Sequence, residues 1–304
     1  MTSSTENQEL VIVTGASTGI GAATARDLAR RGFHVLAGVR RDHDADAIRG
    51  PGIEPVILDI TNADHVEALA TRVREDPQGR GVRALVNNAG IGVNVPIEVY
   101  PIAEWRRLFE VNLFGHVAVT QALLPDLVRS KGRVINISSV GGKVAMATYG
   151  PYAATKFALE AVSDSLRREL ASTGVHVVVV EPGGVVTEMP GRVIASTKKL
   201  ASTMTPDQQQ RYGTLVQAIA AQTAAHTDSG APADAVATVI AKAVTARTPR
   251  TRYTVGREAG LLRFVKFLPD RVLDRAFAAA LRPHFPSGKT HLDSVPASVE
   301  STLT

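Results

Sequence analysis

The stretch Thr14-Gly15-Ala16-Ser17-Thr18-Gly19-Ile20-Gly21 decides the fold of this chain. It follows an apolar, β-branched run at residues 10–14 and leads into residues 19–31, where apolar side chains recur with helical periodicity. Side chains in place of the three glycines would block the close approach of a phosphate. The backbone amides at the start of a helix, together with the helix dipole, attract such a group. The stretch therefore predicts a strand, a turn and a helix that open a dinucleotide-binding βαβ unit.

Apolar runs and helical stretches alternate after this turn. Short apolar runs are typical of buried parallel strands, and each helical stretch is long enough to cross between two of them. The alternation predicts an α/β fold with a single Rossmann-type, doubly wound parallel sheet and helices on both faces. The expected strands lie at 35–39, 56–58, 85–86, 134–137 and 175–180, and the expected crossover helices at 63–75, 103–130 and 151–173.

The pattern loosens after Pro182. Residues 188–207 are rich in Ser, Thr, Lys, Met and Pro, which predicts a mobile flap. Together with a helix expected at 208–224, this gives a substrate flap at about 185–225. A further helix at 232–246 and an edge strand at 253–255 complete a domain that we expect to cover residues 1–256.

The C-terminal residues predict an extension of this domain. Two basic amphipathic helices, divided by Pro269, are expected within residues 257–285, and the polar residues 286–304 predict a disordered tail. The helices either pack on the domain or lie on a membrane surface, and packing on the domain is the simpler expectation.

Composition excludes several classes of protein. The net charge of +5 comes from dispersed basic residues without interleaved aromatic side chains, so we expect no nucleic-acid binding. The absence of cysteine excludes disulfides and thiolate metal sites and fits a cytoplasmic location. The eight histidines lack ligand spacing, so we predict no catalytic metal. No apolar run approaches the roughly 18 residues of a membrane span, so we expect no transmembrane segment.

The end of the second expected strand indicates which dinucleotide binds. A fold that prefers NAD usually places an acidic residue there, whereas residues 37–41 read Ala-Gly-Val-Arg-Arg. The planar guanidinium of Arg40 suits a 2′-phosphate, which points to NADP(H). The alternative is that Arg40 is only a solvated loop residue. Asp59 follows the third strand and residues 87–90 follow the fourth, at the ends where ligands bind in parallel sheets.

The chemistry is expected at Tyr149-Gly150-Pro151-Tyr152-Ala153-Ala154-Thr155-Lys156, which opens a strongly patterned helix. Tyr152 and Lys156 are four residues apart and share one face of it. An ammonium beside a phenol lowers the phenol pKa, and bringing that pKa near neutrality needs a shift of roughly 2–3 units. Taken alone, such a pair is more often a helix surface pair, so its chemical role depends on the rest of the chain.

Together these motifs resemble the short-chain dehydrogenase/reductase family. The motifs occur in order: the glycine turn at 14–21, the Asn-Asn-Ala-Gly segment at 87–90, Asn112, Ser139 with Tyr152 and Lys156, and Pro182-Gly183. The resemblance covers residues 8–190 clearly and 200–255 loosely. The run from 152 to 181, with SDSLRREL and VEPGG around its end, is similar to the retinol and 17β-hydroxysteroid dehydrogenases.

The resemblance implies a site and a reaction. Ser139 lies thirteen residues before Tyr152, the family spacing, and Tyr149 is followed at i+4 by Ala153 rather than by a basic residue, so Tyr152 is the expected acid/base. Lys156 is expected to lower the Tyr152 pKa and to bind the nicotinamide ribose, and Asn112 to anchor a water connected to Lys156. The catalytic set is Asn112, Ser139, Tyr152 and Lys156, and the cofactor set is Gly15, Ser17, Thr18, Gly19, Ile20, Gly21, Arg40, Asp59, Ile60, Asn88, Ala89, Gly90, Tyr152, Lys156, Pro182, Gly183, Val185 and Thr187.

The expected substrate is a hydrophobic alcohol or its ketone or aldehyde, steroid- or retinoid-like, because the segments expected to border it are apolar. Lys198 and Lys199 are the main exceptions there, and we interpret them as solvated. Two alternatives stay open, a non-redox enzyme and a cofactor-binding regulatory protein on the same fold. The resemblance further implies a homodimer or homotetramer through the helices at 103–130 and 151–173. The expected lining is Val93, Val95, Val144, Met146, Val186, Met189, Val193 and Met204.

Overall fold

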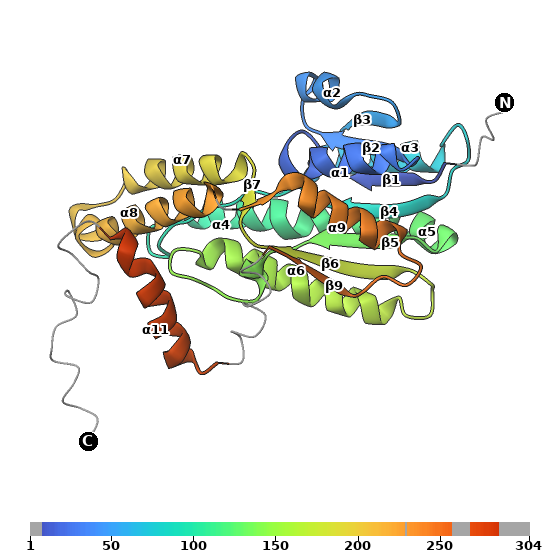
Figure 1. Ribbon diagram of the computed structural model, residues 1–304. Coiled ribbons are helices and arrows are strands. Elements are labelled where there is room, and N and C mark those ends of the chain that lie inside the picture. The colour runs from blue at the N-terminus through green and yellow to red at the C-terminus, as the bar shows by residue number, and fades with distance from the viewer. Residues whose placement is uncertain (1–7, 229, 257–267, 286–304) are drawn as a thin grey trace.

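The computed structural model describes residues 8–228, 230–256 and 268–285, and its main feature is one parallel sheet (Figure 1). Seven strands pair in the order β3-β2-β1-β4-β5-β6-β9, and every pairing is parallel. The predicted doubly wound sheet is therefore confirmed, with β9 at the edge as expected. The strands are β1 (Leu10–Val13), β2 (His34–Val39), β3 (Ile53–Ile57), β4 (Val82–Asn87), β5 (Arg133–Ile137), β6 (His176–Pro182) and β9 (Arg252–Val255).

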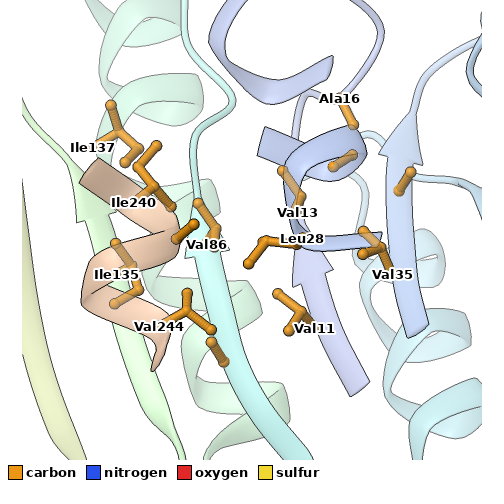
Figure 2. Close-up of a cluster of buried hydrophobic side chains, with 14 of the residues drawn as sticks. Val11, Val13, Ala16, Leu28, Val35, Val86, Ile135, Ile137, Ile240 and Val244 are labelled. Atoms are coloured by element: carbon orange, nitrogen blue, oxygen red, sulfur yellow. The ribbon is translucent and has the colours of Figure 1, made fainter. Parts of the chain in front are cut away.

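The side chains of the strands alternate between two cores, one on each face of the sheet. Val11 and Val13 of β1 pack with Leu28 in the cluster of Figure 2, and Leu10 and Ile12 face the opposite side. Because both faces are covered, the strands read as continuous apolar runs. The first face is covered by α1 (Gly19–Arg30), α2 (Asp42–Ile48) and α9 (Ala233–Thr245), and the second by α3 (Ala63–Arg74), α5 (Gly115–Ser130) and α6 (Gly150–Glu169).

The strand order reverses at β1, which pairs with β2 on one side and β4 on the other. Crossover connections leave this point in opposite directions, so a crevice opens outside the carboxyl ends of the strands. The glycine turn at 14–21 and the segment at 87–90 follow β1 and β4 there. The fold thus brings the two predicted cofactor motifs together.

One long helical stretch carries the residue predicted to be the fourth catalytic member. Helix α4 (Ile102–Phe109) continues through a π-helical turn, η1 (Glu110–Phe114), into α5. By length and composition alone, Ile102–Ser130 could cross a membrane, which the sequence reading did not predict, and half of its most apolar window is buried in the fold. Val119, Leu123 and Leu127 of α5 are fully buried against the sheet.

The segment after β6 is more regular than its sequence predicts. Instead of an irregular flap, residues Met189–Ala201 form helix α7, with Pro190 in its first turn. Val193 and Thr197, four residues apart, are buried, and the Thr197 hydroxyl donates to the Asn94 carbonyl at 2.8 Å. These contacts are distant in sequence, so the local pattern does not reveal them. Helix α8 (Pro206–Asp228) packs beside α7, and the short strands β7 (Val185–Val186) and β8 (Ala231–Pro232) flank the pair.

The C-terminal extension returns to the domain. Helix α11 (Asp270–Leu281) is followed by a 3₁₀ turn, η3 (Arg282–His284). Leu281 is buried against Leu215 and Ile219 of α8, with Phe285 packed beside it. The described part of the extension therefore packs on the domain, as the simpler expectation had it. The helix predicted before Pro269 and the predicted disordered tail lie outside the described residues, apart from the helix's last residue.

Candidate active site

A single cavity of about 920 Å³ lies at the carboxyl ends of the central strands. It is lined by all of the residues predicted for catalysis and cofactor binding except Asn112. The glycine turn, the second-strand Arg40, and the Tyr152 and Lys156 pair come from distant parts of the chain. The fold gathers them around one space large enough for two small ligands side by side.

The glycine turn is held open by Asn88. The Asn88 side-chain amide donates to the carbonyls of Thr14 at 2.9 Å and Gly15 at 3.1 Å. Gly15 has a φ of +65°, and a Cβ there would lie 2.7 Å from the Ala89 Cα, so only glycine fits. Among the described residues, the Thr18 side chain does not cap α1, so the amides of the first turn are left for another acceptor. This cradle fits the pyrophosphate of a dinucleotide.

The far end of the cavity carries opposite charges. Arg40 is exposed at its edge, and Asp59 lies next to it in the lining. Partial burial acts to raise the pKa of Asp59, but hydrogen bonds from Thr61 and the charge of Arg40 outweigh it and lower that pKa below its usual value. Asp59 is therefore an anion, and Arg40 is a cation within reach of a ligand at this end.

The predicted catalytic pair lies at the start of α6. Tyr152 and Lys156 are 8% and 4% exposed, so they are not the helix surface pair that the sequence alone would favour. The Lys156 Nζ lies 5.7 Å from the centre of the Tyr152 ring and donates to the Ile137 carbonyl at 2.9 Å. The Ser139 Oγ, at the end of β5, accepts from the Gly141 amide at 3.1 Å. Strand β5 and helix α6 thus present the three side chains to one end of the cavity.

The predicted lowering of the Tyr152 pKa is not found. Burial raises the pKa of Tyr152 well above its ordinary value, Tyr149 adds to the rise, and the Ser139 side chain opposes it only partly. Burial also lowers the pKa of Lys156 to about 8, although the charge of Glu160 acts in the other direction. The sequence argument considered the neighbouring charge but not the loss of water, and the loss of water dominates here.

Asn112 is placed beside the cavity rather than in its lining. It lies in the π-helical turn η1 and is fully buried. Its Nδ2 also reaches the Thr155 hydroxyl at 3.2 Å, in the first turns of α6. The side chain therefore joins η1 to the first turns of α6 beside the site. Its role in anchoring a water stays a prediction.

Comparison with known proteins agrees with this geometry. The family model described as short chain dehydrogenase matches residues 9–198. The chain belongs to the short-chain dehydrogenase/reductase family. This is a family of oxidoreductases, and the relatives below place the chain in the branch that contains retinol and steroid dehydrogenases, as the sequence motifs predicted.

The relatives of this short-chain dehydrogenase extend over most of its length. Human retinol dehydrogenase 16 is 36% identical and mouse estradiol 17-beta-dehydrogenase 2 is 34% identical, with 87% and 91% of this chain and 86% and 76% of those proteins covered. The NADPH-dependent 3-dehydrocapnine reductase of Ornithobacterium rhinotracheale is 35% identical, with 89% of this chain and 96% of that protein covered. A short-chain dehydrogenase from Burkholderia cenocepacia, solved in complex with NADP, has a TM-score of 0.69 at 25% identity, with 89% of this chain and 98% of that chain covered.

The substrate side of this short-chain dehydrogenase was predicted only in part. Val93, Met146, Met189 and Val193 line the cavity as expected. Val95 and Val144 are buried in the protein, Val186 is exposed on its surface, and Met204 lies outside the lining, so these four were wrongly placed. Because α7 is a helix, only the side chains on one of its faces can reach the cavity. In an irregular flap more of them could do so. Lys198 and Lys199 are exposed, as predicted.

Several polar residues of the lining lie in the segments expected to border the substrate, but they were not named as site residues. Asn94, Gln222 and Thr223 line the cavity beside Ile219, and the Asn94 side chain donates to the Thr223 hydroxyl at 3.2 Å. Arg192 also lines the cavity, where it pairs with Glu188. The sequence predicted no cluster of arginines in this segment. Helix α8 was expected within the substrate flap, but the face that it turns to the cavity depends on packing against α7 and was not predicted.

His116 is a further buried group that sequence reasoning missed. Its Nε2 lies 2.6 Å from the Ala89 carbonyl, and its Nδ1 has no hydrogen-bond partner among the described residues. Burial lowers the pKa of His116 to about 3, and the charge of Lys156 adds to the effect. The ring is therefore neutral, and its Nε2–H donates to the loop that lines the cofactor side.

A buried charge network supports the helix that carries the predicted catalytic pair. The Lys143 ammonium and the Arg252 guanidinium contact one oxygen of Glu160 at 2.6 Å and 3.0 Å. Arg252 also reaches Glu181 at 3.2 Å, directly before Pro182. Burial, and next the charge of Glu160, raise the pKa of Glu181, while the two cations oppose the rise. The network joins α6, the segment after Ser139 and two strands below the cavity.

Proposed function

We propose that this short-chain dehydrogenase is an NADP(H)-dependent oxidoreductase that interconverts a hydrophobic alcohol and its ketone or aldehyde. The observation that carries the proposal is the presence of Ser139, Tyr152 and Lys156 in the same cavity as the glycine turn. An acid, an orienting hydroxyl and a dinucleotide cradle are together what hydride transfer to a carbonyl requires.

The residues for the cofactor are those that line the cavity beside the glycine turn. The first turn of α1 would hold the pyrophosphate, Arg40 the 2′-phosphate, and Lys156 the nicotinamide ribose. The preference for NADP(H) is supported by the absence of an acid at the end of β2 and by the relative named as NADPH-dependent. When bound, the cofactor supplies or accepts the hydride.

The chain's own residues would handle the proton and the orientation. Because its pKa is raised, Tyr152 keeps its proton at neutral pH, as a proton donor to a carbonyl oxygen must. The Ser139 hydroxyl would orient the same oxygen. In the reverse direction Tyr152 would take the proton of the alcohol.

Replacement of Tyr152 by Phe tests this assignment. It deletes the hydroxyl that transfers the proton and leaves the ring packing in place, so turnover should fall to near zero while NADPH binding, measured by fluorescence, is unchanged. Tyr100→Phe is the matched control, because the Tyr100 hydroxyl is bonded to the Glu104 carbonyl outside the cavity. Net consumption of NADPH by the parent enzyme also separates this proposal from a non-redox enzyme and from a regulatory protein. Activity of Tyr152→Phe within tenfold of the parent would refute it.

The cofactor preference is tested at Arg40. A charge-assisted hydrogen bond contributes roughly 1.5–3 kcal/mol, so kcat/KM should favour NADPH over NADH by about tenfold or more. Arg40→Ala should reduce that ratio toward one, whereas Arg41→Ala, at the neighbouring residue outside the cavity lining, should not. A preference that survives Arg40→Ala would count against the assignment.

The substrate we propose is steroid- or retinoid-like. Its support is the apolar surface supplied by Val93, Met146, Met189 and Val193, together with the relatives named for retinol and estradiol. A matched panel of steroid and retinoid carbonyls, long-chain ketones, sugars and 2-oxo acids tests the class. Preference for a 2-oxo acid would overturn it and would direct attention to Arg192.

We further propose a homodimer or homotetramer assembled through α4, α5 and α6. Phe114, in η1 between α4 and α5, and Phe157, on α6, are 52% and 44% exposed, and large apolar side chains at a surface often mark a subunit contact. Light scattering of the parent protein and of a Phe114→Asp, Phe157→Asp variant tests this. A parent protein that is monomeric at assay concentration would contradict it. The expected cytoplasmic location stays a prediction.

A further inference from the structure

Three buried polar side chains follow one another along one face of α6. Tyr152 and Lys156 belong to the proposed site, and Glu160 continues the row four residues further on. A buried carboxylate is costly unless cations pair with it. Here two cations do so, because the Lys143 Nζ lies 2.6 Å and the Arg252 Nη2 lies 3.0 Å from the Glu160 Oε2. The proposed mechanism uses neither of these cations.

The same two cations contact a second buried carboxylate. Glu181, near the end of β6, has a side chain that is 5% exposed. Its Oε1 lies 3.4 Å from the Lys143 Nζ and 3.2 Å from the Arg252 Nε. Two buried carboxylates repel each other unless cations lie between them. The Lys143 ammonium is therefore held at one point, where α6 and β6 meet.

The two cations come from different parts of the fold. Arg252 lies on the edge strand β9, which the sheet already holds through its pairing with β6. Lys143 directly follows a 3₁₀ turn, η2 (Val140–Gly142), and this turn begins immediately after Ser139. Lys143 thus connects the carboxylates to the segment that carries a proposed catalytic residue, whereas Arg252 connects them only to the edge of the sheet.

The η2 turn carries the chain away from the sheet. The backbone bonds donated by the Gly142 and Lys143 amides, at 2.9 Å each, stay within the turn. The Ser139 hydroxyl reaches the Pro182 carbonyl at 3.5 Å, which is the outer limit of a hydrogen bond. By contrast, the Lys143 ammonium makes a short, charge-assisted contact with α6. This contact attaches the end of the turn to the helix that carries Tyr152.

The turn also packs closely on α6. A Cβ at Gly142 would lie 3.1 Å from the Glu160 Cγ and 3.2 Å from the Lys156 carbonyl oxygen. The backbone of the turn therefore lies directly on the part of α6 between these two residues, with no room for a side chain. Glycine permits this approach but makes no directional contact of its own. The ion pair of Lys143 with Glu160, at the same place, supplies one.

We propose that Lys143 is a positioning residue whose ion pairs with Glu160 and Glu181 hold the η2 turn on α6, so that the Ser139 hydroxyl stays within reach of the oxygen that Tyr152 protonates. The inference rests on the proposed function and deepens it, because Lys143 itself does not line the cavity. A reacting group that is misplaced by a small distance loses much of its effect, which is why the hold on the turn matters.

The two cations provide a matched pair of variants. Lys143→Met should lower kcat about tenfold, the size expected for one hydrogen bond to the substrate oxygen, and should leave the dissociation constant of NADPH unchanged. Arg252→Met removes the other cation from the same carboxylates, so it should lose at least as much in Tm. Its kcat should fall far less, because Arg252 does not hold the turn. Equal losses of kcat in the two variants would overturn the inference.

Further substitutions test whether Lys143 acts by its charge and through Ser139. Lys143→Arg keeps the charge and should retain most of kcat, whereas Lys143→Gln should match Lys143→Met and gives the same test should that variant fail to fold. In a Ser139→Ala background, Lys143→Met should have almost no further effect on kcat. Losses that multiply in this double variant, or a Lys143→Gln enzyme that equals the parent, would count against the role of Lys143.

Hydrogen exchange measured by mass spectrometry separates this inference from the proposed function. Lys143→Met should speed the exchange of amides in residues 140–148, and Arg252→Met should leave this segment as in the parent, whatever the protein catalyses. If the parent protein turned over no carbonyl substrate, the proposed function would fail. Exchange would then decide on the hold on the turn alone. Faster exchange only in Lys143→Met supports it, and equal exchange in the two variants overturns it.

Discussion

The side chain of Asn112 forms two hydrogen bonds with the main chain of Ile91. Its Oδ1 accepts from the Ile91 amide at 2.9 Å, and its Nδ2 donates to the Ile91 carbonyl at 2.8 Å. This pairing imitates the contact between two strands and fixes the loop that follows the segment at 87–90. The loop can then lie against η1 without a buried backbone group left unpaired.

Asn112→Ala should destabilise the protein, because it leaves both backbone groups of Ile91 without their partner in a partly buried position. With about 1 kcal/mol for each neutral hydrogen bond, the free energy of unfolding should fall by about 2 kcal/mol. Urea denaturation measures this, with Gln121→Ala on the exposed face of α5 as the control. Equal stability of the two variants would show that the pairing with Ile91 contributes little.

Lys156 should make stability depend on pH in the alkaline range. Its pKa is about 8 in the folded protein, against an ordinary value of 10.5. Between these values the unfolded chain binds the proton and the folded protein does not, so stability should rise with pH by up to about 1.4 kcal/mol per unit. Below pH 8 the buried Lys156 is charged in the folded protein, and the free energy of unfolding is lowered by the full cost of burying that charge.

The corresponding variant is Lys156→Met, which should abolish the rise between pH 8 and 10.5. The free energy of unfolding is measured by urea denaturation at several pH values for this variant and for the parent. Lys242→Met removes an exposed lysine on α9 and should keep the parent slope. If the free energy of unfolding had the same slope against pH in the parent and in Lys156→Met, burial would not lower the pKa of Lys156.

Glu160→Gln should disrupt the buried charge network. The Glu160 side chain is 7% exposed, and its loss of charge removes one of the two carboxylates that Lys143 and Arg252 share, with Glu181 left as the other. Disruption of a buried pair costs roughly 3–5 kcal/mol, whereas exposed pairs contribute about 0–1 kcal/mol. Asp164→Asn, where the side chain is 28% exposed and also pairs with Arg252, should therefore lose much less in urea denaturation. Similar losses in the two variants would contradict this account of Glu160.

Thr148→Gly should stabilise the protein. Glycine adopts a φ of +63° without a Cβ clash, and the change removes a buried hydroxyl that has no partner among the described residues. We expect a gain of about 1 kcal/mol in the free energy of unfolding. Thr238→Gly, on the exposed face of α9, should instead lose stability, and the same loss at Thr148 would show that its backbone is not strained.

The features that the sequence predicts well depend on residues close together in the chain. The turn at 14–21 lies between one strand and one helix, and Tyr152 and Lys156 lie one turn apart on α6. The order of the sheet also follows from local alternation, because parallel strands with short crossovers leave few arrangements. For these reasons the fold and most of the cavity lining were predictable without a structure.

The features that the sequence did not reveal depend on distant contacts or on burial. Arg252 and Glu160 are 92 positions apart, and helix α7 depends on packing against α8 and the loop at Asn94. The pKa of Tyr152 was predicted in the wrong direction because a sequence shows neighbouring charge but not how much water a folded site excludes. Tyr149 was set aside because it lacks a cation, and its position in the cavity, with its ring 5.0 Å from that of Tyr152, follows only from the fold.

The two short strands β7 and β8 close the base of the helical pair α7 and α8. Val185 pairs with Ala231, and the Ala231 amide donates to the Gly184 carbonyl at 2.9 Å, so the chain leaves the main sheet and returns to it at adjacent points. Figure 1 shows the two helices beside the sheet, with no strand of the sheet between them. A segment whose two ends adjoin can be replaced without a change to the rest of the fold. Under the proposed function, replacement of this segment as a whole would change the substrate preference. The strands of the sheet and the residues proposed for proton transfer would stay the same.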